Sequence, residues 1–473
     1  MHPIRCLLLV LFGLFALLPP AAALQLPPPQ VFTLDNGATV ILTPKRDVPL
    51  VAASVVVRGG ALADPPGREG SAWLLAELLG KGAGERSAED FAAAIADLGG
   101  ELYFHASTEA LHAQAQFLAS DADAMLELLA DALQRPTLAQ AEFDKLRERA
   151  IQQLAAQKDG DPRALLSVYG NAWLFQGHPY GRPLQGDPAS LAAITLTDLR
   201  DLAQAQLGAD RAILSIAGDF DPDAMRRAVE QAFGGWGKAT GALPQVSAAP
   251  RPDGPRVLLV DKPGATQSYF WIGTVGAAID DPMRAAQDLV QTLFGGRFTS
   301  QLNTELRVKS GLTYGARAEL DRMAQPGAAA WYSFTRTQTT AQAIDLGLEV
   351  QARLHEKMPS TALMESARRY VLGQFAPEYE THAQVAAALA ELAQYGLPRE
   401  VIEGYDAAIA AVGPEALAAA RAVFPEGRHY AMVVIGDGAQ IAESLGRYGP
   451  VTRMRITDPA FSPAPADGAR STQ

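Results

Sequence analysis

The stretch GREGSAWLLAELLGKG, from Gly67 to Gly82, reads as a short apolar helix between glycines, with one carboxylate, Glu77, in its middle. Residues three and four apart share a face of a helix, so Trp73, Ala76 and Glu77 project in nearly the same direction. Two histidines and a glutamate at this spacing would supply two zinc ligands and a general base. Trp and Ala offer no such groups, so the question is what Glu77 does there alone.

A second group of polar residues lies in NTELRVKSGLTYGARAEL. Arg307 offers a fork of N–H donors, and the Tyr314 hydroxyl can donate to a carbonyl oxygen or to an oxyanion. From the residues alone, an ordinary structural interpretation is open for both. Arg307 could sit in the last turn of a helix that ends near Ser310 and Gly311, where a cation meets bare carbonyls. Tyr314 could be half-buried core at the start of a strand.

The remaining candidates favour no other chemistry. His178 is best interpreted as a hydrogen-bonded structural histidine, and His105 and His112 as structural or surface residues on a strand-like stretch. The sequence contains neither a G-x-x-x-x-G-K-[ST] phosphate loop nor a G-x-S-x-G nucleophile elbow. The only cysteine is Cys6. Nucleotide binding and cysteine catalysis are therefore unsupported.

The N-terminal segment, residues 1–23, predicts a secretory signal peptide cleaved after Ala23. It has one arginine, an apolar run and then small residues. No later apolar run is long enough to span a bilayer. The formal net charge is -12 and no Lys/Arg run occurs, so nucleic acid is a poor partner. We expect an exported protein, periplasmic or secreted, with no membrane span in the mature chain.

Hydrophobic patterning predicts an α+β fold made of two similar halves. The first half reads as strands around an Asn36-Gly37 turn, followed by alanine-rich helices and a buried strand. The helices are expected over 88–97, 121–134, 137–158 and 161–175, and the buried strand over 211–220. Similar strands then recur, and RGGALADPP matches TVGAAIDDP with Gly60 and Gly276 in register.

The expected organisation is two α/β sandwich halves in a clam-shell arrangement, each a mixed, mainly antiparallel sheet with helices packed on it. The halves are predicted over 24–239 and 257–455. A Pro- and Gly-rich linker over 240–256 joins them. The segment 456–473 is rich in Pro and small residues and is expected to be disordered.

These segments resemble the pitrilysin/insulinase family of inverted zinc peptidases, particularly its processing-peptidase-like branch. The resemblance runs from LDNGATVIL through VVVRGGALADPPGREGSA, FDKLRERAIQQL and GHPYGRPLQGDPASLAAIT to LFGGRFTSQLNTELRVKSGLTYGARAEL. It therefore covers nearly the whole mature chain. Family members carry two related halves, which agrees with the internal repeat.

The resemblance implies that the zinc site of this chain is degenerate. Members with a working site carry histidines at the positions of Trp73 and Glu77, the catalytic glutamate at Ala76, and a third ligand, also glutamate, at or next to Gln153. One carboxylate cannot replace three protein ligands and an activated water. We therefore expect no metal or other cofactor in this chain and no independent peptidase activity.

The resemblance also implies a substrate-binding role for Arg307 and Tyr314, which in the family hydrogen-bond the substrate backbone near the scissile carbonyl. The combination is similar to the non-catalytic subunit of heterodimeric bacterial enzymes. We expect a pseudo-peptidase that pairs with a homologous zinc-bearing subunit and binds a peptide or unfolded protein. One alternative is a structural or peptide-binding member with no role in proteolysis, and another is a self-sufficient zinc enzyme.

Overall fold

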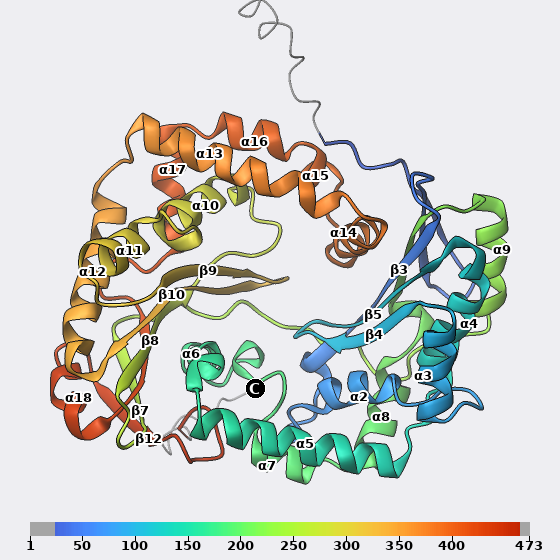
Figure 1. Cartoon of the computed structure of the whole chain (residues 1–473), viewed down its shortest axis with the longest axis horizontal. Helices are drawn as coiled ribbons and strands as arrows, with labels where there is room; N and C mark the ends of the chain where they lie inside the picture. Colours follow the sequence, from blue (N-terminus) through green and yellow to red (C-terminus); the bar gives the residue numbers. More distant parts are fainter. Residues whose placement is uncertain (1–23, 464–473) are drawn as a thin grey trace, which may run out of the picture.

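The computed structural model describes residues 24–463 and contains two six-stranded sheets (Figure 1). From edge to edge the first sheet contains β1 (Gln30–Thr33), β2 (Thr39–Pro44), β6 (Ala212–Gly218), β3 (Leu50–Arg58), β5 (Ala110–Leu118) and β4 (Glu101–Ala106). The second contains β12 (Val451–Arg455), β7 (Arg256–Asp261), β11 (Ala431–Gly436), β8 (Gln267–Val275), β10 (Pro326–Arg336) and β9 (Ala316–Arg322). The predicted signal peptide lies outside the described residues.

Five strands occupy corresponding places in the two sheets. The order β2-β6-β3-β5-β4 corresponds to β7-β11-β8-β10-β9, with one parallel pair, β2 with β6 or β7 with β11, followed by antiparallel pairs. Only the sixth strand differs, because β1 pairs antiparallel with β2 whereas β12 pairs parallel with β7. The predicted pair of homologous α+β halves is therefore confirmed.

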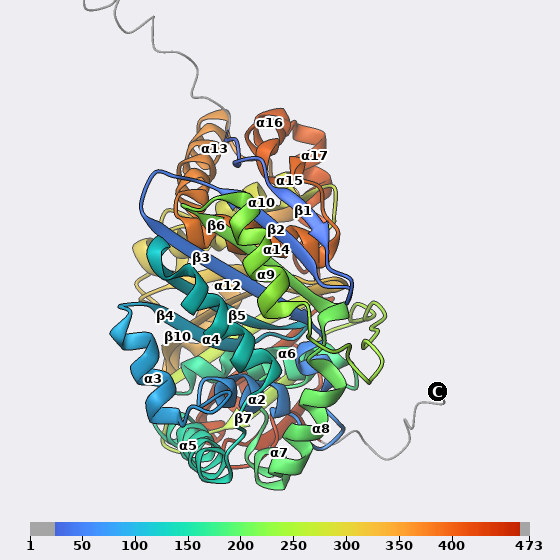
Figure 2. The same cartoon turned by 90° about the vertical axis from the view of Figure 1, so that its right-hand side faces the viewer.

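Eight helices belong to the first half, and α4 and α9 lie over the outer side of its sheet (Figure 2). They are α2 (Ser71–Leu79), α3 (Ala88–Asp97), α4 (Ala122–Gln134), α5 (Gln140–Asp159), α6 (Leu166–Leu174), α7 (Pro188–Ala193), α8 (Leu196–Gln206) and α9 (Pro222–Phe233). The expected helix over 88–97 is α3, which begins where Ser87 Oγ accepts from the N–H of Asp90. The helix expected over 161–175 is shorter, because Pro162 opens a 3₁₀ turn before α6.

The second half is connected through residues 234–255, which contain no helix or strand. Its helices are α10 (Arg284–Gln291), α11 (Gln301–Asn303), α12 (Thr340–Glu356), α13 (Thr361–Phe375), α14 (His382–Tyr395), α15 (Glu400–Glu403), α16 (Tyr405–Ala411), α17 (Pro414–Ala420) and α18 (Gly438–Leu445). Within residues 24–463, none of the helices is both long and apolar enough to cross a bilayer.

Each half contributes one helix to the sheet of the other half. Helix α14 packs on β3 and β6 of the first sheet, and α6 packs on β8 and β11 of the second (Figure 1). The alternation of side chains along a strand explains why this is needed. On β3, Val55 points into the core shared with the first half's own helices, whereas Val56 joins the core that contains Leu389 of α14. Both faces of each sheet are thereby buried.

The hairpins of the two sheets meet at a buried carboxylate, Glu109. The hydroxyl of Tyr180 donates to Glu109 Oε1 at 2.6 Å, and the hydroxyl of Tyr395 on α14 donates to Oε2 at 2.9 Å. The backbone N–H of Ala324, in the β9–β10 turn, donates to the same carboxylate at 3.0 Å. Burial, and then the Glu109 carboxylate, raises the pKa of both tyrosines, so both hydroxyls keep their protons at neutral pH. Glu109 therefore joins the two halves through two donors from the second half, Tyr395 and Ala324, while Tyr180 of its own half supplies the third hydrogen bond.

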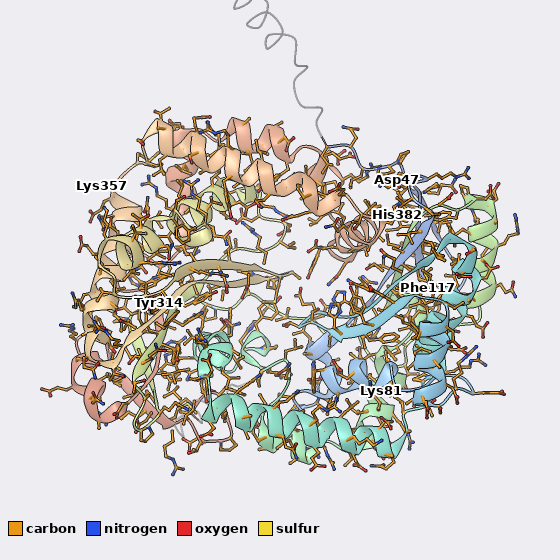
Figure 3. All side chains as sticks on the ribbon, in the orientation of Figure 1. Asp47, Lys81, Phe117, Tyr314, Lys357 and His382 are labelled. Carbon is orange, nitrogen blue, oxygen red and sulfur yellow. The ribbon has the colours of Figure 1, made fainter. Side chains whose placement is uncertain are left out.

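A second polar contact between the halves lies at the start of α14. His382 is buried, with Nε2 at 2.6 Å from Asp47 Oδ1 and Nδ1 at 3.1 Å from the carbonyl oxygen of Leu50 (Figure 3). Asp47 and Leu50 belong to the loop and strand that follow β2 in the first half. The first turn of α14 is thus tied to the sheet that it covers.

The segment after β12 corrects one expectation. Residues 456–463 were predicted to be part of a disordered tail, but Phe461 is buried and packs edge-on against Tyr169 of α6, with ring centroids 4.9 Å apart. Lys158, at the end of α5, donates to the carbonyl oxygens of Asp458 and Pro459. A single aromatic anchor and these hydrogen bonds order a segment whose composition favours disorder. Residues 464–473 lie outside the described residues.

Gly170 tests the packing of α6 on the second sheet. A Cβ at Gly170 would lie 2.6 Å from ring atoms of the buried Trp271 on β8, so we expect Gly170→Ala to lower the free energy of unfolding by about 1–3 kcal/mol. Gly373 in α13 is the matched control, because a Cβ there meets no atom within 4 Å. Gly373→Ala should be neutral or stabilising by up to about 1 kcal/mol. Equal effects of the two changes in urea unfolding would contradict this packing.

Glu109→Gln tests the junction between the hairpins. A glutamine keeps the shape but has one acceptor oxygen for three donors, so we expect a loss of about 1–3 kcal/mol in the free energy of unfolding. Glu101→Gln, on the exposed edge strand β4 of the same hairpin, is the control and should change stability by less than about 0.5 kcal/mol. If Glu109→Gln and the unmodified protein gave coinciding thermal melting curves, the junction would not contribute to stability.

Candidate functional site

Helix α2 carries the degenerate metal-binding positions. It begins after Gly70, whose φ of 97° turns the chain, and Asp64 caps it by accepting from the N–H groups of Gly70 and Ala72 at 2.8 and 2.7 Å. Burial raises the pKa of Asp64 to about 7, against the opposing effect of these two hydrogen bonds. Asp64 thus holds the start of the helix in place and contributes no ligand to the face of Trp73.

The positions where the family would bind zinc do not form a ligand set. Ala76 is fully buried, Trp73 and Glu77 are half-buried, and Gln153 is an exposed residue on α5, which packs against α2. Over residues 24–463, no group of three His, Cys, Asp or Glu side chains is arranged to hold a metal. Trp73 and Ala76 pack in the hydrophobic core around the first half's own helices, and neither side chain has an atom that can bind zinc. The residues present therefore do not fit zinc.

Arg307 lies in a different environment, near the edge of the second sheet. Two π-helical turns, η6 (Thr292–Gly296) and η7 (Thr304–Lys309), lead to it, and the chain leaves η7 at Gly311 with a φ of 64°. The N–H of Gly311 donates to the carbonyl oxygen of Arg307 at 3.2 Å, which closes the turn. The expected helix end near Ser310 and Gly311 is confirmed, although the last turn is π-helical.

Tyr314 is neither strand nor half-buried core, so that alternative is wrong. It lies in the loop before β9, and 80% of its surface is exposed. The loop is held by Thr313, whose hydroxyl donates to the carbonyl oxygen of Gly315 and accepts from Ser333. Because Thr313 and Ser333 are buried, the loop is anchored while Tyr314 projects outward.

Arg307 and Tyr314 line one pocket of about 460 Å³. The guanidinium of Arg307 lies over the ring of Phe298, 4.8 Å from its centroid, and Phe298 is itself 61% exposed. Within the described chain, no carboxylate lies within 4.0 Å of Arg307, since the neighbouring Glu305 pairs with Lys309 and Arg353. The guanidinium and the phenol hydroxyl are thus available to accepting atoms of a ligand.

The structure keeps the two predicted groups of residues apart. Every residue that lines the pocket belongs to the second half, between 291 and 319 together with Tyr370. Trp73, Ala76, Glu77 and Gln153 all belong to the first half, and in Figure 3 Tyr314 lies well away from Lys81, which closely follows α2. None of these four positions therefore lines the pocket of Arg307 and Tyr314.

The three histidines considered from the sequence have structural contacts. His178 bonds through Nε2 to the carbonyl oxygen of Ser247 at 2.7 Å, and its Nδ1 accepts from the N–H of Tyr180. His105 and His112 are cross-strand neighbours on β4 and β5 with stacked rings, 4.6 Å between centroids. Burial lowers the pKa of His112 to about 4, so this ring is neutral at pH 7.

Sequence reasoning missed two residues that matter here, Glu109 and Arg297. Glu109 lies in an ordinary hairpin turn, and no feature of the neighbouring sequence indicates that Tyr180 and Tyr395 will hydrogen-bond to it. Arg297 follows the glycines of LFGGRF and lines the pocket of Arg307 and Tyr314. A lone arginine directly after a pair of glycines, just before an exposed aromatic residue, could have drawn attention to it.

Comparison with known proteins matches both halves of the chain. Residues 39–188 match the model described as Insulinase (Peptidase family M16), and residues 193–371 match the model described as Peptidase M16 inactive domain. An uncharacterized zinc protease of Mycobacterium tuberculosis is 30% identical over 320 residues, which cover 66% of this chain and 71% of that protein. One of Mycobacterium leprae is 29% identical over 302 residues, 64% of this chain and 68% of the relative.

Two solved structures share the fold. A peptidase M16 inactive domain from Pseudomonas fluorescens superimposes with a TM-score of 0.81 at 22% identity, covering 86% of this chain and 98% of that one. A protease from Helicobacter pylori gives a TM-score of 0.82 at 19% identity, covering 87% and 100%. At these identities the likeness concerns the arrangement of helices and strands.

The incomplete set of zinc ligands at the positions on α2 and α5 leads to a prediction about metal. The purified chain should hold far less than one zinc per molecule after exposure to zinc and removal of free metal, because no three ligands converge there. The triple variant Trp73→His, Glu77→His, Gln153→Glu should gain zinc, because it restores the family's donor types. Elemental analysis of both proteins measures this. Stoichiometric zinc in the unmodified chain would contradict the interpretation.

Proposed function

Because this chain belongs to the insulinase (peptidase M16) family, we propose that it is a non-catalytic subunit that pairs with a homologous zinc-bearing peptidase. Arg307 and Tyr314 bind the peptide backbone near the bond that the partner cleaves. The observation that carries this proposal is the contrast between the two halves. Of the residues at the metal positions only Glu77 carries a strong zinc ligand, which is too few for a site, whereas Arg307 and Tyr314 share one open pocket.

The chemistry of the pair suits an extended peptide. A guanidinium donates to backbone carbonyl oxygens in a fixed fork, and a phenol hydroxyl can donate to the oxygen on which negative charge develops during attack. Neither group requires a metal on the same chain. The partner would hold the zinc, and its bound water would supply the nucleophile.

We also propose that the complex works outside the cytoplasm, in the periplasm or after secretion. The N-terminal pattern of one arginine, an apolar run and small residues before Ala23 supports this. The substrate class that suits the pair is a peptide or an unfolded segment of protein, because only an extended backbone presents its carbonyl groups to both side chains.

The test is a peptidase assay of the zinc-bearing partner with and without this chain. Arg307→Ala and Tyr314→Phe should each lower kcat/KM of the complex by about 10²–10³-fold, as expected when one transition-state donor is lost. Arg336→Ala is the matched control, since Arg336 is exposed and lies outside the pocket. It should leave activity unchanged.

The assay also separates this proposal from the alternative of a structural or peptide-binding protein with no role in proteolysis. In that case the partner alone would be fully active, and both variants would be silent. Gel filtration of each variant with the partner controls for assembly, because a pocket side chain should affect turnover without affecting the amount of complex.

A further inference from the structure

Arg297 is a buried cation in the wall of the Arg307–Tyr314 pocket. Only 8% of its surface is exposed. Its Nη1 donates to the hydroxyl of Ser366 on α13 at 3.0 Å, and its Nε is buried without an acceptor. The guanidinium also lies 5.9 Å from the centroid of the Tyr370 ring. A neutral hydroxyl and an aromatic ring are thus its contacts, and neither neutralises the charge.

The other buried arginines of the described chain have better acceptors. Arg421 donates to the carbonyl oxygens of His355 and Lys357, and Arg211 donates to the side-chain oxygen of Gln206 and the carbonyl oxygen of Gly241. Hydrogen bonding to acceptors of this kind is the usual condition for burying a charge. Arg297 does not meet it within residues 24–463, because one hydroxyl leaves most of its five N–H donors without partners.

The surroundings of the pocket are positive although the protein is acidic. Arg297, Arg307 and Arg317 all line it, and in the described part of the chain none of them lies within 4.0 Å of a carboxylate. The lining contains one carboxylate, Glu319, whose Oε1 already accepts from the Tyr332 hydroxyl at 2.5 Å. The whole chain carries a net charge of -12, so a cavity lined by three arginines has a local charge opposite in sign to that of the protein as a whole.

Burial makes the charge of Arg297 unfavourable unless an anion is bound, whereas Arg307 and Arg317 are exposed to water. Removal from water lowers the pKa of Arg297, as it does for the other buried arginines, Arg211 and Arg421. A carboxylate would accept from two N–H groups of a guanidinium at once and would offset the desolvation of the cation. A cavity of about 460 Å³ is within the range of about 300–1,000 Å³ typical of small-ligand sites.

We propose that this pocket binds a carboxylate of the peptide that Arg307 and Tyr314 hold, with Arg297 as its principal partner. The carboxylate is that of an acidic side chain or of the peptide C-terminus, since both present the same group. The proposal rests on the proposed function and adds to it a preference for acidic or C-terminal segments. Arg297 contacts the ligand and sets its specificity, and it takes no part in bond cleavage.

Three synthetic peptides of equal length separate the two sources of the carboxylate. One contains a glutamate and has an amidated C-terminus, the second replaces that glutamate by glutamine, and the third keeps the glutamine but has a free C-terminal carboxylate. Binding to the assembled complex is measured by fluorescence anisotropy. We expect one carboxylate peptide to bind about tenfold or more tightly than the neutral one, as a hydrogen-bonded charge pair gives.

Arg297→Met should remove this preference, so that the two carboxylate peptides bind no more tightly than the neutral peptide. Arg297→Lys should keep part of it, because lysine retains the charge without the planar fork. Arg336→Met is the control outside the pocket and should retain the full preference. Without peptide, Arg297→Met should not lower the melting temperature, because it removes a buried charge that lacks a partner. A purely structural role would lower it.

The outcomes distinguish this proposal from the proposed function. If the complex binds all three peptides equally while Arg307→Ala weakens all of them, the carboxylate preference is wrong and the backbone-binding role stands. If none of the peptides binds, both are wrong. If Arg297→Met fails to fold, the proposal is judged from the carboxylate preference of the unmodified complex and from the part of that preference that Arg297→Lys keeps.

Discussion

Each of the two sheets has apolar side chains on both faces, but the helices of its own half cover only one face. The strands β3, β6 and β11 are buried along nearly their whole length, so an uncovered face would expose a continuous apolar surface. Helix α14 supplies the missing cover for the first sheet and α6 supplies it for the second. Separation of the halves would uncover both faces at once, so the position of the Arg307 pocket relative to α2 is set by hydrophobic packing.

The polar junction at Glu109 follows from that packing. When two hairpin tips meet in a buried place, their backbone N–H groups and any nearby hydroxyls must find acceptors. The Glu109 carboxylate accepts from Tyr180, Tyr395 and Ala324 and therefore resolves this requirement for residues from both halves. The contact between the halves thus depends on a core that holds them together and on one carboxylate that accepts from the donors at the hairpin tips.

The two groups of residues that the sequence singled out lie in different environments in the fold. On α2, Trp73 and Ala76 became part of the first core, where apolar packing is sufficient to explain them. Around Arg307, by contrast, the fold leaves Tyr314 and Phe298 exposed, and among residues 24–463 the buried Arg297 pairs with a hydroxyl and not with a carboxylate. Apolar packing does not account for those three features, which is why the second half is the place to look for ligand binding.

Patterns in the sequence were sufficient to predict the local helices and turns and the incomplete set of zinc ligands. The Asn36-Gly37 turn and the helix over 88–97 depend on short-range patterns, the internal repeat depends on the likeness of two distant segments, and the incomplete set of zinc ligands depends only on residue types. Tertiary structure alone decided that α6 and α14 cover each other's sheets, that Phe461 orders the segment after β12, and that Arg297 lies beside Arg307 and Tyr314. These features arise between residues far apart in the chain, where burial and charge depend on which surfaces meet, and no local pattern encodes that.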